Sequence, residues 1–351
     1  MSSPAEFRLD AVNAASGLFD DVIDVRAPSE FAEDHLPGAI NLPVLDDEER
    51  ARVGTIYKQV SPFDARRIGA SLVAANAARH MAGPLADRPG SWRPLVYCWR
   101  GGQRSGSLSI ILAQVGWRVS RLDGGYKAWR AQVVRRVQDL GFPGQVIVLD
   151  GKTGSAKTAI LNRLALRGHQ VVDLEGLANH RGSLFGHMGG QPSQKLFEGR
   201  LASGLEALDP TRPVLVEAES SRIGNLTLPK AVWAGICTAP RLALRVPVKA
   251  RAAYSARNYA DIAGDPARLH EILHRLALLH PADRIAEWHR LADAGQWADL
   301  AQGLMQDHYD PRYDKHRARY GERVRGVVEI GALADLDAAT GRVEMELAKL
   351  V

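Results

Sequence analysis

The chain has 351 residues, enough for two domains that each bury a core. Apolar residues make up 46% of it and charged residues 24%, which excludes a disordered or collagen-like chain. The net charge of +5 is compatible with an anionic partner, and two cysteines, Cys98 and Cys237, exclude a disulfide framework and a zinc-finger spacing. Neither a secretory signal pattern nor a membrane-length apolar run is evident, so the sequence predicts a cytoplasmic protein without membrane contact.

Short apolar runs alternate with polar turns in the first part of the chain. The sequence predicts a strand at residues 21–26, a short helix capped by Ser29, and a turn and strand over residues 35–43. Residues 46–80 are charged, and we interpret them as a solvated helical insertion. Strands that alternate with helices favour a mostly parallel, doubly wound α/β sheet. Other elements expected here are strands at residues 95–98 and 117–122 and helices at residues 108–115 and 128–140.

A candidate nucleophile ends one of these strands. Cys98 closes an apolar run, a glycine-containing loop follows, and Arg104 opens an amphipathic segment. Loop N–H groups and a helix N-terminus favour the thiolate form of a cysteine, and Arg100 and Arg104 add positive charge. We therefore assign catalytic roles to these three residues; a buried core cysteine is the alternative. The expected oxyanion-binding loop comprises Trp99, Gly101, Gly102, Gln103 and Ser105.

Two signatures around this loop resemble the rhodanese family. The opening signature is resembled by DVR at residues 24–26 with Pro28, by EF at residues 30–31 and by HLPGAIN at residues 35–41. DGGYKAW at residues 123–129 resembles the closing one. The resemblance covers residues 8–137 and implies a rhodanese-like, doubly wound domain. It also implies that the loop cysteine, here Cys98, carries sulfur or selenium as a persulfide or selenosulfide.

The loop departs from the usual sulfurtransferase pattern in its length. The spacing from Cys98 to Arg104 is C-x5-R, one residue longer than in most sulfurtransferases. That length also resembles the dual-specificity phosphatases, whose loop holds a phosphate group. A loop of this size also suits a phosphorylated selenium donor.

A second domain, residues 146–351, is predicted after a linker at residues 138–145. Its first apolar strand runs into a glycine-containing loop and a helix, the arrangement of a P-loop NTPase-like α/β domain. Lys157 would neutralise a phosphate chain, and Thr158 could ligate Mg²⁺. Ala156 replaces the second glycine of the pattern, which leaves nucleotide hydrolysis open. The expected diphosphate-binding residues are Gly151, Lys152, Thr153, Gly154, Ser155, Ala156, Lys157 and Thr158.

The remainder of this domain alternates strands at first and then turns basic and helical. An apolar strand at residues 213–220 ends in carboxylates and resembles a Walker B element, with Glu217 and Glu219 on the same side of the strand. From residue 240 the sequence predicts mostly helices, with an aromatic, charged turn at residues 308–314. Arginines near aromatic rings suit unstacked RNA, although a solvated face would look similar. The candidate RNA-binding residues are His180, Arg181, Arg222, Arg245, Lys249, Arg251 and Arg257.

Over nearly all of residues 8–320 the chain resembles the bacterial tRNA 2-selenouridine synthase family. The matching motifs include CWRGGQRS at residues 98–105, HRGS at 180–183, VEAES at 216–220 and YDP at 309–311. The resemblance implies geranylation of a wobble 2-thiouridine with geranyl diphosphate, followed by replacement of the geranylthio group with selenium from selenophosphate. It further implies that the partner is the anticodon stem-loop of tRNA and that an enzyme which supplies selenophosphate can be a second partner. No tightly bound cofactor is expected.

Two other classes of function stay open on the residues alone. One is a rhodanese-type sulfurtransferase or phosphatase with a nucleotide-hydrolysing domain, which would turn over without selenophosphate. The other is a non-catalytic chalcogen carrier, which would bind tRNA and leave 2-thiouridine unchanged.

Overall fold

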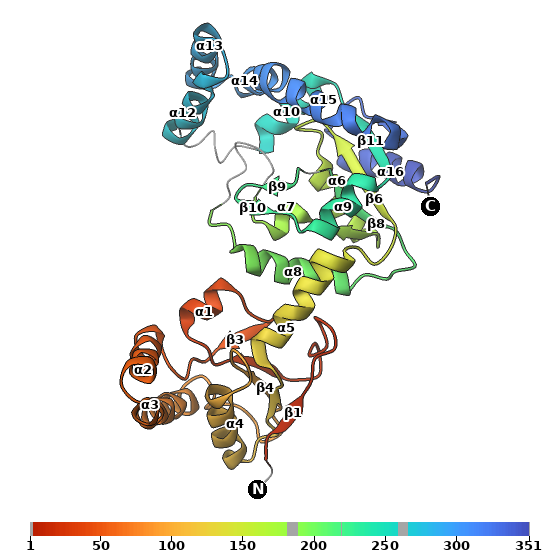
Figure 1. Cartoon of the computed structure of the whole chain (residues 1–351). Coiled ribbons are helices and arrows are strands. Elements are labelled where there is room, and N and C mark those ends of the chain that lie inside the picture. The colour runs from red at the N-terminus through yellow and green to blue at the C-terminus, as the bar shows by residue number, and fades with distance from the viewer. Residues whose placement is uncertain (1–2, 181–188, 219, 259–265, 351) are drawn as a thin grey trace. The chain divides into compact units, whose positions relative to one another are not determined.

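The fold is α/β throughout, as the sequence predicts (Figure 1). The computed structural model describes residues 3–180, 189–218, 220–258 and 266–350.

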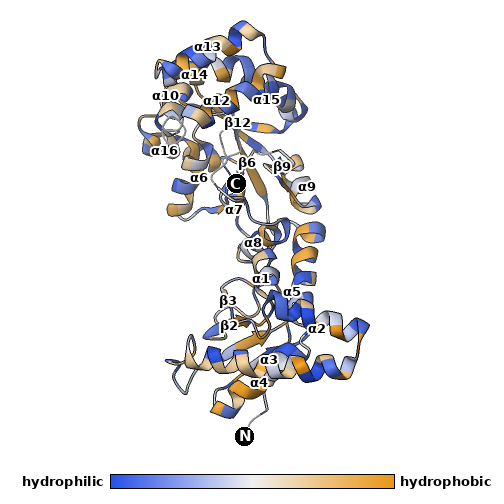
Figure 2. Ribbon diagram, turned by 90° about the vertical axis from the view of Figure 1, so that its left-hand side faces the viewer, coloured by the Kyte–Doolittle hydropathy of each residue, from blue (hydrophilic) through white to orange (hydrophobic). Residues whose placement is uncertain are grey.

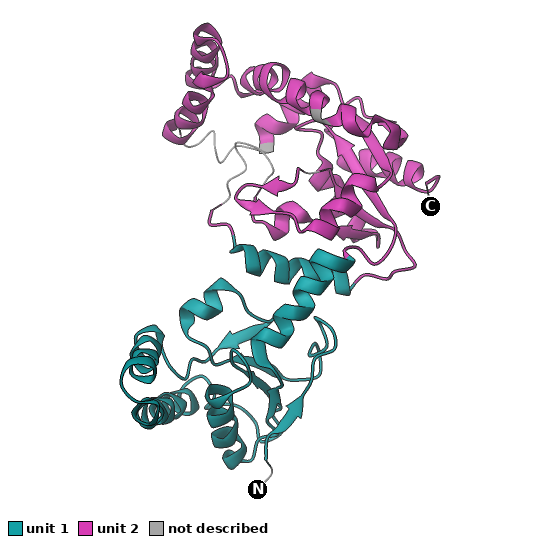
Figure 3. Ribbon diagram, in the orientation of Figure 1, with its two compact units in different colours: residues 1–140, 192–207 teal, residues 141–191, 208–351 magenta. Residues whose placement is uncertain are grey.

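The chain divides into two compact units (Figure 3). Unit 1 comprises Met1–Leu140 and Pro192–Ala207, and unit 2 comprises Gly141–Gln191 and Leu208–Val351. The division expected from sequence instead assigned everything after a linker at residues 138–145 to the second domain. The difference arises because the helix formed within Pro192–Ala207 packs with unit 1.

Unit 1 is built on a parallel sheet whose five strands follow the order β1-β5-β4-β2-β3. Leu95, Val96 and Tyr97 of the central strand are fully buried. Cys98 follows that strand and so lies at the carboxyl edge of the sheet, where parallel sheets collect reactive groups. The strands are β1 (Ala5–Phe7), β2 (Asp21–Asp24), β3 (Ala39–Asn41), β4 (Pro94–Tyr97) and β5 (Ser120–Leu122).

The predicted helical insertion is confirmed as two helices. Asp46 caps the first of them, accepting a 2.8 Å hydrogen bond from Glu49 N–H, while Glu49 accepts one from Asp46 N–H. Asn76 of the second donates to the Val44 carbonyl and to the Glu49 carboxylate, which ties the insertion to the domain. The helices of this part are α1 (Pro28–Glu33), α2 (Asp47–Gln59), α3 (Pro62–Ala82), α4 (Gln103–Val115), α5 (Gly125–Val134) and the π-helix η1 (Arg135–Leu140).

Helix α8 (Gln194–Glu206) completes unit 1 although it is encoded far from the rest of it. Gly199 packs so closely that a Cβ there would lie 2.8 Å from Cη2 of Trp129. Arg130 of α5 forms an ion pair with Glu198, and Asn13 donates to the Ser203 carbonyl at 2.9 Å. These contacts hold α8 against α5 and the N-terminal segment.

Unit 2 contains a second parallel sheet, with the order β12-β11-β6-β8-β7, and a separate antiparallel pair, β9 and β10. Its central strand β6 is apolar along most of its length, as the orange ribbon in Figure 2 shows. Strands buried on both faces need such continuous apolar runs. The strands are β6 (Val146–Gly151), β7 (Gln170–Val172), β8 (Val214–Glu217), β9 (Arg222–Ile223), β10 (Leu226–Thr227), β11 (Arg241–Arg245) and β12 (Val324–Glu329).

The helical prediction from residue 240 onward is wrong for its first residues. Arg241–Arg245 is strand β11, which pairs with β6 on one side and β12 on the other. Its central residues, Leu242, Ala243 and Leu244, are apolar and buried. The arginines at both ends suggested a solvated helix, but Arg241 is itself buried and pairs with Asp150.

The prediction of a turn at residues 308–314 is also wrong, because these residues are helical. The π-helix η3 (Met305–Tyr309) continues into α15 (Asp310–Arg317), and Pro311 is accommodated in the first turn of α15. The other helices are α6 (Lys157–Leu166), α7 (Leu174–Leu177), α9 (Lys230–Thr238), α10 (Val248–Asn258), α12 (Pro266–Arg275), η2 (Leu276–Leu278), α13 (Ala282–Asp293), α14 (Trp297–Leu304), η4 (Ala318–Arg323) and α16 (Leu336–Leu347).

Within the described part of the chain, every helix is too short or too polar to cross a bilayer.

A buried histidine in unit 2 predicts a loss of stability at acid pH. Nδ1 of His308 accepts a hydrogen bond from Arg312 Nη1 at 2.9 Å, and Nε2 of His280 lies 2.9 Å from the same nitrogen. Burial, the Arg312 charge and His280 lower the pKa of His308 from 6.5 to about 4. Between these values the unfolded chain binds a proton that the folded chain does not. The free energy of unfolding of this region should therefore fall as the pH decreases from 6.5 towards 4.

Hydrogen–deuterium exchange of α12–α15 at neutral and at acid pH, corrected for the intrinsic exchange rate, measures this effect. His308→Asn keeps an acceptor near the position of Nδ1 but cannot titrate, so its loss of protection on acidification should be smaller. An equal loss in both proteins would place the acid-sensitive group elsewhere.

Candidate catalytic loops

The loop around Cys98 joins β4 to the N-terminus of α4. The thiol is buried, and its Sγ lies 3.1 Å from the hydroxyl of Ser105, which also lies 3.2 Å from the Gly102 carbonyl oxygen. A hydroxyl has one proton and rotates freely, so Ser105 can donate to the carbonyl beside a thiol and to the sulfur beside a thiolate. Gly102 is the N-cap residue of α4, so the helix N-terminus faces the same loop.

The N–H groups of this loop are available to an anion. Among the described residues, none accepts a hydrogen bond from the backbone N–H groups of residues 99–105. Gly101 has a φ of +68° and would bring a Cβ within 2.8 Å of the Leu122 carbonyl, which explains a glycine at that position. Gln103 and Gly102 are exposed, as is Trp99, at 37%. These N–H groups stay the predicted donors of an oxyanion-binding loop.

The first turn of α5 fixes the back of the loop. The Cys98 carbonyl accepts a 2.8 Å hydrogen bond from Tyr126 N–H, and the Trp99 carbonyl accepts one of 3.0 Å from Lys127 N–H. Gly125 makes this approach possible, because a Cβ there would lie 2.3 Å from the Cys98 carbonyl oxygen. The closing signature at residues 123–129 is thus the support of the Cys98 loop.

Gly125→Ala should therefore displace the loop. The position has a φ of +57° as well as the close contact, so an alanine is strained and clashes. A shift of the nucleophile by about 1 Å is expected to lower the activity that depends on Cys98 about a hundredfold. Gly17→Ala is the matched control, since Gly17 has a φ of +71° and open space around its Cβ position. If both variants lose activity equally, the contact with the loop is not the cause.

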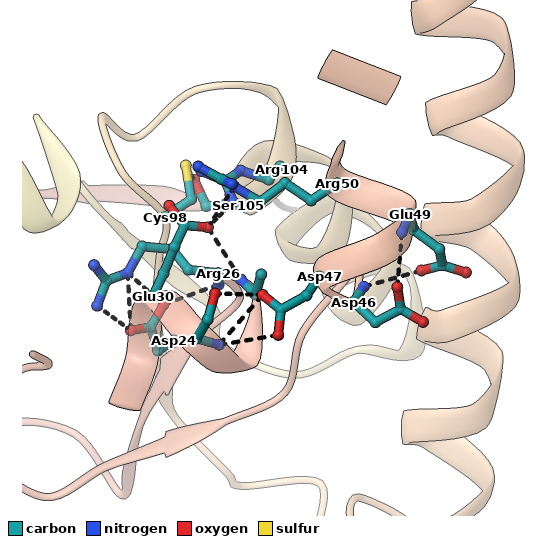
Figure 4. A network of polar contacts seen from close by, with 12 residues as sticks. Asp24, Arg26, Glu30, Asp46, Asp47, Glu49, Arg50, Cys98, Arg104 and Ser105 are labelled. Carbon is teal, nitrogen blue, oxygen red and sulfur yellow. Dashed lines mark hydrogen bonds and ion pairs between the residues drawn. The ribbon is translucent and has the colours of Figure 1, made fainter. Parts of the chain in front are cut away.

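The positive charge of Arg104 is held in place by an acid that the sequence did not assign. Nη1 of Arg104 donates to Glu30 at 2.7 Å, and Arg50 of the insertion contacts the same carboxylate at 3.0 Å (Figure 4). Burial would raise the pKa of Glu30, but Arg104, the Ala27 N–H and Arg50 together hold it below its usual value. Glu30 is therefore ionised and orients Arg104. Arg100 is exposed, and no described residue pairs with its guanidinium.

The second loop joins β6 to α6 in unit 2. Nζ of Lys157 lies 3.3 Å from the Glu217 carboxylate at the end of β8. The Thr158 hydroxyl lies 2.8 Å from Glu217 and 3.1 Å from Glu175, although it has only one proton to donate. Two carboxylates beside one hydroxyl suit a divalent cation. Glu175 lies in the first turn of the short helix α7 and belongs to no recognisable motif, so the sequence did not indicate it.

Residue 156 is an alanine where the P-loop pattern has a glycine, and the local backbone geometry explains why the pattern prefers glycine there. Ala156 is the N-cap residue of α6 and has a φ of +60°, the left-handed region that costs an L-residue about 1–2 kcal/mol. The loop nevertheless keeps its turn, because the Lys152 carbonyl accepts hydrogen bonds from the N–H and hydroxyl of Ser155. Gly151 ends β6 directly before it.

The outer side of this loop is held by the C-terminal helices. Arg251 of α10 donates to the Thr153 carbonyl at 3.0 Å and pairs with Asp310 of α15 through two hydrogen bonds. Lys152 contacts Asp314 at 2.8 Å. A Cβ on Gly154 would lie 2.6 Å from Met305 Cε, so this side of the loop is packed.

Arg251 must therefore be removed from the candidate RNA-binding residues. Its side chain is 3% exposed and is engaged by Asp310 and by backbone carbonyls. Arg245 lies at the end of β11 and pairs with Glu329, so it is not part of a basic helix. His180 is half-buried. The exposed candidates that the structure describes are Arg222, Arg245, Lys249 and Arg257, and Arg181 lies outside the described residues. Glu219 of the predicted Walker B element also lies outside them.

In the described ranges, no three His, Cys, Asp or Glu side chains form a group that could hold a metal ion. Thr158, the residue predicted to ligate Mg²⁺, has the carboxylates of Glu217 and Glu175 beside it.

Comparison with known proteins matches both units. Residues 9–132 match the model of the rhodanese-like domain, and residues 144–272 match the model of the tRNA 2-selenouridine synthase AAA domain. The tRNA 2-selenouridine synthase of Nitrosomonas europaea is 40% identical over 220 residues, which are 60% of this chain and 56% of the relative. That of Sulfurovum sp. is 40% identical over 237 residues, 66% of this chain and 63% of the relative. That of Hahella chejuensis is 32% identical over 340 residues, 86% of this chain and 87% of the relative.

Proposed function

The chain belongs to the tRNA 2-selenouridine synthase family, and from that premise we propose that it is a tRNA-modifying transferase of selenium-containing groups. In the proposed reaction, geranyl diphosphate alkylates the sulfur of a wobble 2-thiouridine, and selenium from selenophosphate then replaces the geranylthio group. The observation that supports two steps is that one chain carries two strand–loop–helix turns of different kinds, one around Cys98 and one before Lys157, each suited to an anion by its helix N-terminus.

The loop in unit 2 suits the alkylation step. Charge develops on the diphosphate as it leaves, and N–H groups and cations that are already in place stabilise that charge. Lys157 supplies a cation, and a diphosphate would draw it from Glu217, its present partner. Thr158 and Glu217 would hold Mg²⁺, which when bound would neutralise part of the diphosphate charge.

The loop in unit 1 suits the selenium step. Sulfur doubly bonded to a pyrimidine carbon is a poor leaving group, and alkylation turns it into a thiol that can leave. The selenium that replaces it must come from a reactive donor. Cys98 would be the nucleophile, and the N–H groups of its loop together with Arg104 would stabilise an anionic selenophosphate.

The proposal also covers the partners and the place of action. The RNA would be the anticodon stem-loop of tRNA, contacted by exposed cations such as Arg222, Lys249 and Arg257. A selenophosphate-supplying enzyme is a further candidate partner, no tightly bound cofactor is required, and the site of action would be the cytoplasm.

Reconstitution tests the proposal. The purified chain is incubated with an anticodon stem-loop that contains 2-thiouridine, and the nucleosides are analysed by mass spectrometry. We expect S-geranyl-2-thiouridine with geranyl diphosphate alone and 2-selenouridine when selenophosphate is added. Sulfur transfer or nucleotide hydrolysis without either co-substrate would favour a sulfurtransferase or phosphatase. RNA binding without any modification would favour a chalcogen carrier.

A further inference from the structure

On the basis of the proposed function, we propose that Cys98 attacks the phosphorus of selenophosphate rather than its selenium. The step would form a phosphocysteine and release hydrogen selenide beside the RNA. A rhodanese-like selenosulfide on the same cysteine is the alternative, and the two differ in the phosphorus product.

The shape of the loop favours a phosphoryl group. Residues 99–105 turn around the sulfur with N–H groups that donate to no other described residue, and α4 adds its N-terminus. Arg104 reaches the loop with its direction set by Glu30, which accepts from only one of its nitrogens in the described contacts. A planar guanidinium and a ring of N–H groups match the three equatorial oxygens of a phosphoryl group under attack.

Ser105 supplies a hydrogen-bond donor for the sulfur when it leaves the phosphorus. Its hydroxyl lies 3.1 Å from Cys98 Sγ and can donate to it once the sulfur carries a charge. The sulfur carries that charge twice, before it attacks and again when water displaces it from phosphorus. A selenosulfide would also end in a thiolate once a reductant cleaves it, so the Ser105 contact serves either route and the choice between them rests on the phosphoryl-shaped loop and on the electron balance.

The electron balance of the overall exchange supports attack on phosphorus. The sulfur leaves the base as a thiol, so selenium must arrive in the same oxidation state, as a selenide. Selenium in selenophosphate already has that state. Transfer of selenium to a thiolate would oxidise it, reduce the phosphorus to phosphite, and later require a reductant to return two electrons.

The proposed steps balance without such a reductant. The Cys98 thiolate forms a bond to phosphorus while the phosphorus–selenium bond breaks, and the electron pair leaves with hydrogen selenide. Water then cleaves the sulfur–phosphorus bond, which gives inorganic phosphate and restores the thiolate. Hydrogen selenide adds to the base carbon, the carbon–sulfur bond breaks, and geranylthiol leaves with the proton.

The charges near the sulfur agree with a leaving group that needs no proton. Glu30 is the acid that contacts Arg104, and its two arginine partners keep it ionised, so it cannot donate a proton. Hydrogen selenide is a strong enough acid for its anion to leave unaided, unlike the alkoxide of an ordinary phosphate ester.

The phosphorus product decides between the two routes. The full chain is incubated with selenophosphate, with and without geranylated stem-loop RNA, and phosphorus is followed by ³¹P NMR. We expect release of phosphate faster than in the protein-free reaction and no phosphite. Phosphite in amounts matching the selenium transferred would overturn the proposal.

Ser105→Ala provides a second measurement on the cysteine itself. Loss of the donor to the departing sulfur should slow hydrolysis of the phosphocysteine by about ten- to a hundredfold, so that radioactive phosphorus accumulates on Cys98. Cys237→Ser is the matched control and should leave the labelling unchanged, because Cys237 lies in unit 2 beside Tyr320. Selenium without phosphorus on Cys98 would establish the selenosulfide instead.

The outcomes also separate this step from the proposed function. If 2-selenouridine forms and phosphorus never reaches Cys98, only the attack on phosphorus is wrong. If phosphocysteine forms and the RNA is unchanged, the chemistry of the loop stands and the tRNA-modifying role is wrong.

Discussion

A chain with Cys98→Ser is expected to form no 2-selenouridine and to accumulate S-geranyl-2-thiouridine. A hydroxyl is rarely ionised at neutral pH and is a much weaker nucleophile than a thiolate, so the selenium step should slow by at least about a thousandfold. Serine is close to cysteine in volume and can keep the contact with Ser105, so the loop should retain its shape. The alkylation step needs no thiolate and should continue.

Both nucleosides are measured by mass spectrometry, in a deletion strain carrying the variant or with purified protein. Cys237→Ser controls for the general loss of a thiol and should support both steps. Normal 2-selenouridine from the Cys98 variant would show that another group acts on selenophosphate.

The second large effect is expected at Lys157. In Lys157→Ala the diphosphate loses a contact with a charged group, which typically contributes about 1.5–3 kcal/mol. That corresponds to a geranylation rate about ten- to 150-fold lower. Selenium exchange on RNA that is already geranylated should change less, because no diphosphate leaves in that step.

Two comparisons make this result specific. Lys157→Arg keeps the charge and should recover part of the rate. Lys152→Ala should cost less than Lys157→Ala, because two acids of α15, Asp310 and Asp314, hold Lys152 on the outer side of the loop. A thermal unfolding curve shows whether the buried Glu217 carboxylate destabilises the Lys157→Ala protein. Equal loss of both steps would mean that the P-loop binds the RNA or serves a site common to the two reactions.

The two loops could be predicted from the sequence because each is a local pattern. An apolar strand, a glycine-containing turn and a helix start follow one another within a short stretch at Cys98 and again at Lys157. Backbone geometry then follows from the residues present, and both five-stranded sheets are parallel as strand–helix alternation indicates.

What supports the loops could not be predicted, because the partners are distant in sequence. Glu30 and Arg104 are 74 residues apart, and Arg251 and Asp310 are 59 residues apart. A basic, helical segment gives no sign that one of its arginines will be buried by an acid that comes later. Glu175 could not be predicted for the same reason, because it contacts the Thr158 hydroxyl beside Glu217, which comes from the distant strand β8.

Helix α8 has a consequence for the order in which the protein is made. Unit 1 includes Pro192–Ala207, so the chain leaves unit 1 after Leu140, returns to it and leaves again. Synthesis on the ribosome runs from the N-terminus, and Trp129, fully buried in the finished protein, emerges long before Gly199 can pack on it. A fragment that ends at Leu140 contains all the residues that match the rhodanese-like domain and still lacks this helix of unit 1. Unit 1 therefore cannot complete its fold during synthesis until α8 has been made, and α8 is made after the P-loop.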